Sequence, residues 1–301
     1  MFRRALISSF SVVVLVAACS MYGSTVQPSF TAEDQALIDE HVYGGLPSTN
    51  NIHVRQGYIL SWSPSTRTPS WVAYHVVPDY MKHPKRKGRF SSFRGDPDIS
   101  NEPTSADYTG LLASRGYARG HLAPFAIMGG DRDGDGDYAE YHPNSTNVGD
   151  AYDAETVYQS NYRSNIAPQH HTGFNGGPDL WYELERWIQD DLVKKQESEV
   201  WVFAGCVFGQ GTPERVGTNA DVAVPPMFFK IVILDDPNAD PPIVLAYLLP
   251  HQRVRHGELD SFLVSVDVIE ALTGLDFFPN ETEEDWLEDQ DTWNFAQTHF
   301  E

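Results

Sequence analysis

Apolar runs bounded by turn residues constrain the fold of this 301-residue chain more than any other feature. In the C-terminal half, residues 200–208, 228–234 and 243–249 form short apolar runs, which are typical of buried strands. Residues 57–63 and 70–77 form two more, and the proline-containing turn between them predicts a hairpin. A chain with this many buried strands needs a sheet at its core.

Helical patterns accompany these strands. Trp181, Leu184 and Ile188 recur at helical spacing with charged residues between them, and Pro178 suits the first turn of a helix. The pattern therefore predicts a helix that starts near Pro178. We also expect a short helix near residues 33–42 and another over 259–272.

A leader segment precedes the fold. Arg3 and Arg4 stand before an apolar stretch at 5–16, and small residues then run up to Cys19. This resembles the signal of bacterial lipoproteins, in which the cysteine becomes the lipidated N-terminus. We therefore expect residues 1–18 to be a lipoprotein signal peptide and Cys19 a membrane anchor. The chain would then be exported, to the bacterial outer membrane, the periplasm or the medium. An ordinary signal peptide with an incidental cysteine is the alternative.

The rest of the chain divides simply. Residues 19–50 are polar and rich in turn residues, and we expect them to be a tether. A single domain is then expected over residues 51–301, with an acidic C-terminal tail. Cys206 lies in an apolar run, which favours a buried structural thiol over a nucleophile.

The charge distribution limits the partners. The chain carries a formal net charge of −21, and an acidic protein repels nucleic acid at long range. A role on a polyanion therefore needs a local basic patch. Residues 82–94 hold six of the 21 lysines and arginines. We expect this cluster to bind a substrate backbone, although a solvated loop is the alternative; its candidate binding residues are Lys85, Arg86, Lys87 and Arg94.

Residues 114–124 carry the candidate chemistry. Histidine has an ordinary pKa near neutrality, so His121 can accept a proton at little cost. The guanidinium groups of Arg115 and Arg119 match phosphate oxygens. Together they indicate chemistry on a phosphate, with Arg115 as a further substrate-binding residue. A surface loop with an incidental histidine is the alternative.

An acidic loop follows. Asp131, Asp133, Asp135 and Asp137 alternate with other residues around a glycine, as in the first half of an EF-hand calcium loop. The twelfth position is His142 rather than the glutamate that such a loop uses. The pattern predicts a structural Ca²⁺ site, with a flexible acidic insertion as the alternative.

Several motifs in a fixed order resemble the DNA/RNA non-specific endonuclease family. They are Gly116–Pro124, Ser164–Gln169, Phe174–Gly176 and Trp181–Glu185, and the likeness extends over residues 52–280. The resemblance implies an α+β fold of the ββα-metal, or His-Me finger, type. Its central sheet would be mixed or antiparallel and flanked by helices.

The resemblance also implies roles. His121 would be the general base, and Arg119 would contact the phosphate or the charge of the transition state. Asn175 would be the direct protein ligand of Mg²⁺, with Mn²⁺ as an alternative ion, and Glu185 would hold water around the metal. Asn165 would support the loop that carries the metal ligand.

Two departures from the family pattern affect this assignment. The family's usual aspartate is replaced by Ala118, three residues before His121. Asn175 and Glu185 are ten residues apart, where the family pattern has about eight, so Glu183 competes with Glu185.

The sequence thus predicts a Mg²⁺-dependent endonuclease that cleaves DNA and RNA with little sequence preference and leaves 5′-phosphate ends. Two other classes stay open: a non-catalytic nucleic-acid-binding lipoprotein, and a surface lipoprotein stabilised by Ca²⁺. DNA and RNA are the expected partners, together with a membrane through Cys19. No protein partner is evident.

Overall fold

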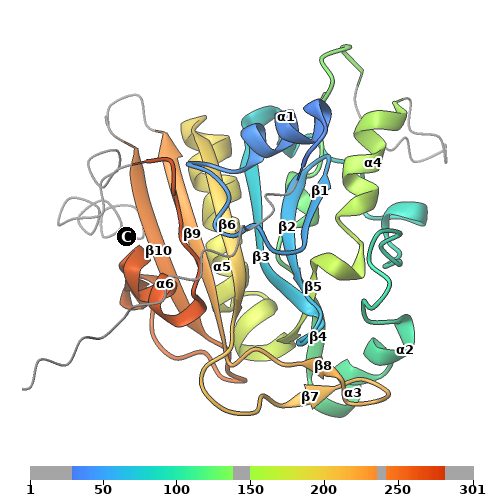
Figure 1. Ribbon diagram of the computed structural model, residues 1–301, viewed down its shortest axis with the longest axis vertical. Coiled ribbons are helices and arrows are strands. Elements are labelled where there is room, and N and C mark those ends of the chain that lie inside the picture. The colour runs from blue at the N-terminus through green and yellow to red at the C-terminus, as the bar shows by residue number, and fades with distance from the viewer. Residues whose placement is uncertain (1–28, 138–149, 236–241, 282–301) are drawn as a thin grey trace, which may run out of the picture.

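A seven-stranded antiparallel sheet forms the centre of the protein (Figure 1). The computed structural model describes residues 29–137, 150–235 and 242–281. The strands follow the order β1-β2-β3-β6-β9-β10-β11. Their bounds are β1 (Ile52–Arg55), β2 (Tyr58–Ser63), β3 (Thr68–Val76), β6 (Glu199–Val207), β9 (Met227–Asp235), β10 (Ile243–Pro250) and β11 (Leu263–Val264).

The sheet agrees closely with the apolar runs of the sequence. The predicted hairpin is β2 with β3, which pair antiparallel with Ile59 opposite Ala73. The three predicted C-terminal strands are β6, β9 and β10, and the ends of each strand lie within two residues of the ends of its apolar run. Cys206 lies in β6 and is 6 % exposed, and burial raises the pKa of its thiol. The prediction of a buried structural thiol is therefore confirmed.

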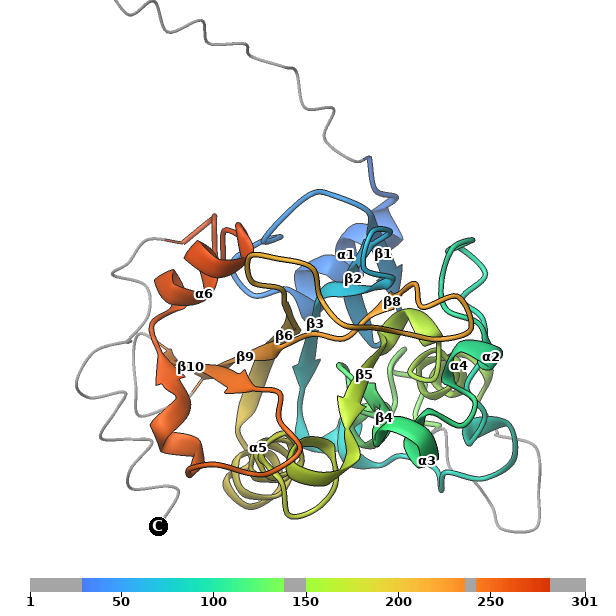
Figure 2. The same cartoon turned by 90° about the horizontal axis from the view of Figure 1, so that it is seen from below.

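Helices cover both faces of the sheet, as Figure 2 shows from below. On one face, α1 (Ala32–His41) and α6 (Val266–Thr273) pack with Ile59, Trp71 and Phe203. On the other face lie α4 (Ala151–Gln159), α5 (Leu180–Arg186) and the π-helical segment 187–195 that continues α5. Neighbouring residues of a strand point to opposite faces, so Ile59 and Leu60 belong to different cores. The result is a three-layer α+β architecture, as expected.

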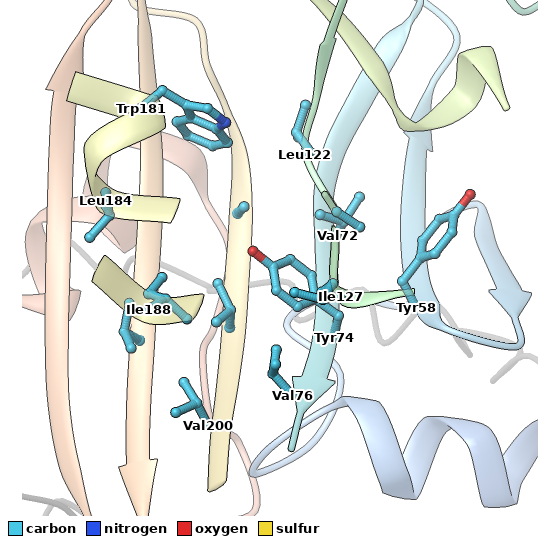
Figure 3. Close-up of a cluster of buried hydrophobic side chains, with 14 of the residues drawn as sticks. Tyr58, Val72, Tyr74, Val76, Leu122, Ile127, Trp181, Leu184, Ile188 and Val200 are labelled. Carbon is cyan, nitrogen blue, oxygen red and sulfur yellow. The ribbon is translucent and has the colours of Figure 1, made fainter. Parts of the chain in front are cut away.

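The helix that follows Pro178 buries one face against the sheet. Trp181, Leu184 and Ile188 belong to one buried cluster with Val72 of β3 and Val200 of β6 (Figure 3). All five side chains are at most 3 % exposed. The predicted helical spacing is confirmed, and the helix begins at Leu180, two residues after the proline. This packing fixes the helix that carries Glu185.

Two expectations differ from the structure. The predicted helix over 259–272 is a 3₁₀ turn, then β11, then α6, because β11 pairs with β10 at Ala246 and Tyr247. The predicted helix near 33–42 is confirmed as α1, but it lies within residues 19–50, where we expect a tether; a capping box between Thr31 and Asp34 closes its N-terminus. Ile38 of α1 is 4 % exposed in the core, so this helix belongs to the folded unit.

The remaining elements are short and gather around two ribbons. One ribbon pairs β4 (Tyr117–His121) with β5 (Ile166–His170), and a smaller one pairs β7 (Arg215–Val216) with β8 (Val222–Ala223). The short helices are α2 (Ser105–Tyr108), α3 (Leu111–Arg115), η1 (Pro78–Met81), η2 (Gly88–Phe90), η3 (Phe125–Ile127), η4 (Arg163–Asn165), η5 (His171–Asn175), η6 (Trp187–Lys195) and η7 (Leu259–Phe262).

The leader and the tail lie outside the described residues, as does Cys19. Among the described helices, none has both the length and the apolar character needed to cross a membrane.

Candidate active site

The ribbon of β4 and β5, followed by α5, forms a ββα unit beside the sheet (Figure 2). Gly116 has φ +76°, in the left-handed region, and makes the turn from α3 into β4. Gly120 is required for a different reason. A Cβ atom at this position would lie 1.9 Å from Oε1 of Gln169, which pairs with β4 across the ribbon. The predicted fold class is confirmed by this unit and by the sheet.

His121 ends β4, and its Nε2 atom has two neighbours. Nη2 of Arg86 and Oδ1 of Asn161 each lie 3.3 Å away. The amide of Asn161 is fixed because its Nδ2 donates to the carbonyl of Phe90 at 3.1 Å. Burial, and next the charge of Arg86, lower the pKa of His121 to about 3, against the effect of the hydrogen bond to Asn161. The imidazole is therefore neutral at physiological pH.

Two arginines lie in the same cavity as His121. The guanidinium group of Arg86 lies between the rings of Phe93 and Phe125, at 5.4 and 5.3 Å, and Nη2 donates to Asn161 Oδ1 at 3.1 Å. Arg119 lies 5.0 Å from the Phe93 ring. Aromatic faces hold both guanidinium groups in place and leave hydrogen-bond donors for an anion.

Asn175 lies at the end of η5, the segment that follows β5, and lines the same cavity as His121. Its Nδ2 donates to Oε1 of Gln169, and Gln169 is fully buried. The amide nitrogen is thereby engaged, so that Oδ1 remains the atom available to a ligand. Gly173 has φ +87° and approaches Arg253 closely, which forms the bend that brings Asn175 to the cavity.

Glu185 and Glu183 are placed differently. Glu185 lines the cavity and forms an ion pair with the fully buried Lys230, with Oε1 3.5 Å from Nζ. Nζ also lies 3.9 Å from the Trp181 ring. Burial raises the pKa of Glu185 and lowers that of Lys230 to about 8, while each charge stabilises the other. Glu183 instead pairs with Arg255 on the surface.

These side chains share one cavity of about 310 Å³. It brings together four of the predicted site residues with one member of the basic cluster: His121, Arg119, Asn175, Glu185 and Arg86. Tyr182 and Gln189 also line it. A neutral imidazole, two guanidinium groups, an amide oxygen and a carboxylate therefore face one space, and phosphodiester hydrolysis can use groups of these kinds.

Asn165 supports a different segment from the one expected. It is fully buried, its Oδ1 accepts from the N–H of Ala123 at 2.9 Å, and its Nδ2 donates to the carbonyls of Ala123 and Ser160. The backbone of Asn165 also accepts from Leu122. Asn165 thus holds the chain that follows His121, rather than the loop of Asn175.

Several predicted binding residues lie elsewhere. Arg115 pairs with Glu214, and both are about half exposed. Lys85 and Lys87 are exposed beside Arg86 and do not line the cavity. Arg94 lies 3.2 Å from the centroid of the Tyr158 ring and donates to two carbonyls, which indicates a structural role.

The acidic loop brings three carboxylates together. Asp131, Asp133 and Asp135 each place one oxygen within 4.8 Å of the others. Backbone N–H groups of Gly134 and Gly136 donate to Asp131. The N–H of Asp137 donates to Asp135, so Asp137 belongs to the same turn. The twelfth position, His142, lies outside the described residues.

Sequence reasoning missed three residues of this site. Asn161 was not assigned, although it lies four residues before Asn165. Gln169 is only the end of the Ser164–Gln169 motif, and Lys230 lies in the predicted strand 228–234 without an assigned role. Lys230 did carry a signal, because a lysine between the apolar runs of a predicted buried strand needs a charged partner.

Comparison with known proteins identifies the family. The family described as DNA/RNA non-specific endonuclease matches residues 39–284. The chain belongs to this family. It is 28 % identical to the Nuclease of Serratia marcescens over 232 residues, which cover 76 % of this chain and 75 % of that one. It is also 28 % identical to human mitochondrial Endonuclease G over 249 residues, which cover 78 % and 72 %.

A solved structure supports the fold independently. The crystal structure of the EndoG/EndoGI complex matches with a TM-score of 0.63 at 21 % identity, covering 86 % of this chain and 96 % of that one. The family and its named nucleases show that the chain is an endonuclease.

The relatives correct one prediction. Most of those named are mitochondrial nucleases, from budding yeast and fission yeast to worm and human. The prediction of export to the bacterial outer membrane, the periplasm or the medium is therefore wrong. The signal peptide over residues 1–18 and the anchor at Cys19 stay predictions.

Proposed function

We propose that this endonuclease hydrolyses DNA and RNA with His121 as the general base and with Mg²⁺ as its cofactor. The observation that carries the proposal is the neutral imidazole of His121, which faces Asn175 and Glu185 across one cavity. A neutral imidazole has a free lone pair, so it can accept a proton from water without first losing one.

Two neighbours of Nε2 bear on which nitrogen of His121 acts. The Nδ2 atom of Asn161 is bound by the Phe90 carbonyl, so its Oδ1 accepts at 3.3 Å from Nε2, whereas Arg86 Nη2, also at 3.3 Å, is a donor and favours a bare Nε2. Arg86 also donates to Asn161 Oδ1 at 3.1 Å, so its proton need not point at the ring. We therefore assign the proton to Nε2 and the lone pair that takes the proton from the attacking water to Nδ1.

The donor set fits a hard divalent cation. Asn175 offers a carboxamide oxygen and Glu185 a carboxylate, and both are oxygen ligands of the kind that Mg²⁺ prefers. Mg²⁺ keeps most of its water, so one neutral oxygen from the protein with a nearby carboxylate is a reasonable site. When bound, the ion supplies positive charge against the developing negative charge of the phosphate and the leaving oxygen.

The arginines act on the substrate. Arg119 and Arg86 line the cavity on either side of His121, and we assign them to the phosphate oxygens. Water attacks phosphorus, the bond to the 3′ oxygen breaks, and that oxygen takes up a proton. The products are a 5′-phosphate and a 3′-hydroxyl end. Lys85 and Lys87, exposed beside Arg86, would bind neighbouring phosphates.

A plasmid assay tests this proposal. Purified protein should nick and then linearise a plasmid with Mg²⁺ or Mn²⁺, and EDTA should stop the reaction. His121→Ala and Asn175→Ala should each lose at least a hundredfold in rate, whereas the matched control Glu183→Gln should keep it, within about twofold. DNA ligase should reseal the nicks, because it requires a 5′-phosphate beside a 3′-hydroxyl. Full activity of His121→Ala would sink the assignment of the base.

A structural Ca²⁺ site is a second proposal. The approach of Asp131, Asp133 and Asp135 within 4.8 Å supports it, because three carboxylates this close repel one another without a cation. The side chain of Arg132 ties this loop to the segment after His121 by donating to the carbonyls of Ile127 and Gly129.

A further inference from the structure

A second cavity lies at the other end of the ribbon that carries His121. Its volume is about 510 Å³, and it shares no lining residue with the catalytic cavity. Tyr117 at the start of β4 and His170 at the end of β5 form one side of it. Tyr117 is four residues from His121, so the two cavities are about 13 Å apart along the strand.

Stacked rings form the inner wall. The rings of Tyr117 and His170 lie 4.5 Å apart at 24°, and the ring of His251 lies 4.5 Å from that of His170 and 6.0 Å from that of Tyr117. Both nitrogens of His251 are engaged, since Nε2 accepts from the backbone of His170 and Nδ1 donates to the carbonyl of Pro225. Nδ1 of His170 is different: it is buried and has no hydrogen-bond partner among the described residues.

A buried nitrogen on a residue that lines the cavity can be satisfied by a ligand there. His170 is only 8 % exposed, so bulk water does not solvate it freely. Leaving such a group unsatisfied is costly, and a ligand atom in the cavity would satisfy it. The imidazole is neutral, because burial and the charge of Arg253 lower its pKa. It can therefore meet either a donor or an acceptor, according to its tautomer.

The other walls select against an anion. Val224, Pro225 and Pro226 form an apolar side, and Gln210 adds an amide. The carboxylate of Glu214 also lines the cavity and accepts from the hydroxyl of Tyr117 at 2.9 Å. A phosphate would be repelled by this carboxylate. A flat, neutral heterocycle with polar edges fits the size and the mixed character of the walls.

Cations stand just outside the cavity. Arg115 pairs with Glu214 at 3.2 Å and is 53 % exposed, and Arg253 donates to the carbonyl of Arg115 at 3.0 Å. These two guanidinium groups can meet the phosphate of a nucleotide whose base lies inside. This would give a role to Arg115, a predicted substrate-binding residue that does not line the cavity of His121.

We propose that this cavity is a subsite for an unpaired nucleobase of the substrate strand. The base would stack near Tyr117 and hydrogen-bond to His170 Nδ1, while a phosphate of the same strand occupies the catalytic cavity. The inference rests on the proposed nuclease function. Because a base must leave its duplex stack to enter, the subsite favours single strands and unpaired regions.

Filling the cavity tests the proposal. Gly209 lines it, does not need a positive φ, and an added Cβ there meets no atom within 4 Å. Gly209→Trp should therefore occupy the cavity without straining the backbone, and Gly209→Ser is the matched control. Thr212→Trp fills the same cavity from an exposed position and serves as the second variant.

The first readout is binding of adenosine, which has a base and no phosphate, followed by ligand-observed NMR. Wild type and Gly209→Ser should bind it, and both tryptophan variants should weaken binding at least about tenfold. The second readout is KM for an unpaired oligonucleotide, which should rise about tenfold in the tryptophan variants. Hydrolysis of bis(p-nitrophenyl) phosphate, which has no nucleobase, should not change.

The experiments distinguish failure of the nucleobase subsite from failure of the proposed nuclease function. Adenosine that does not bind to wild type, or that binds equally well to the folded tryptophan variants, overturns the subsite. Loss of bis(p-nitrophenyl) phosphate hydrolysis in those variants also overturns it, since the filled cavity would then act on catalysis. An inactive wild type would instead refute the nuclease mechanism, and adenosine binding would still report on the cavity.

Discussion

Lys230→Met is the perturbation that most directly tests how the active-site carboxylate is held. Lys230 is fully buried in the middle of β9, and its Nζ lies 3.5 Å from Oε1 of Glu185. Methionine has a similar length and shape without the charge. The substitution therefore removes the cation and leaves the packing against Trp181 largely in place.

The expected loss can be worked from the geometry. Two opposite charges at 3.5 Å attract by about 5 kcal/mol at an effective dielectric constant of about 20. Breaking a buried ion pair on one side typically costs about 3–5 kcal/mol, because the other charge stays buried without compensation. The side chain of Glu185 is 18 % exposed to the cavity, where water screens it, so we expect the lower end. For a domain of this size, about 3 kcal/mol lowers Tm by about 6–12 °C.

The assay combines Tm with steady-state kinetics in a double-mutant cycle. Lys230→Met should lower kcat about 10–100-fold with little change in KM, since Glu185 loses the group that orients it. Adding Glu185→Gln should restore at least half of the lost Tm while kcat stays low. Arg255→Met, which removes the surface partner of Glu183, is the control and should cost at most about 1 kcal/mol. Additive Tm losses in the double mutant would refute the reasoning.

Three further predictions follow from the site and the loop. Arg86→Gln should move the acidic limb of the kcat/KM profile to higher pH, measured from about pH 4 to 8, because Arg86 lowers the pKa of His121 and the base works only when neutral; an unmoved limb would contradict this. Ca²⁺ at about 1 mM should raise the Tm of wild type by several degrees and not that of Asp133→Asn, and equal shifts would exclude the Asp-rich loop as the site. Ala118→Asp should raise both Tm and kcat and leave the pH profile unchanged, because the new carboxylate would accept a hydrogen bond from the buried Nε2 of Gln169. Ala118→Ser is the control, and a lower Tm for Ala118→Asp would count against this hydrogen bond.

The sequence was a good guide to the strands and to most of the residues that line the cavity of His121. Apolar runs located β6, β9 and β10 because burial on both faces of a central sheet demands continuous apolar residues. The predicted helix over 259–272 was wrong because Leu263 and Val264 fit both a helical and a strand pattern. In the fold these two residues pair with β10 and form a strand. Such pairing joins distant segments, which local periodicity does not contain.

The basic cluster shows the same limit within the site. Arg86 and Arg94 look equivalent in the sequence, eight residues apart in one charged segment. In the fold, the rings of Phe93 and Phe125 hold Arg86 over the cavity, whereas Arg94 is held by Tyr158. Phe93 belongs to the charged segment itself, but Phe125 and Tyr158 come from other segments. Composition therefore predicted that a cation would be present, and tertiary contacts determined which one.

The missing motif aspartate affects the metal side of the site more than the base. His121 obtains its orientation from Asn161 and Arg86, and neither contacts position 118. Ala118 stands directly opposite Gln169 across the ribbon, so their side chains share one face. Nε2 of Gln169 is buried and has no partner within the described part of the chain, while its Oε1 holds Asn175. A carboxylate at position 118 would accept from Nε2 and fix that amide. The alanine therefore leaves the base intact and loosens the support of Asn175, so its cost should appear in metal affinity and kcat.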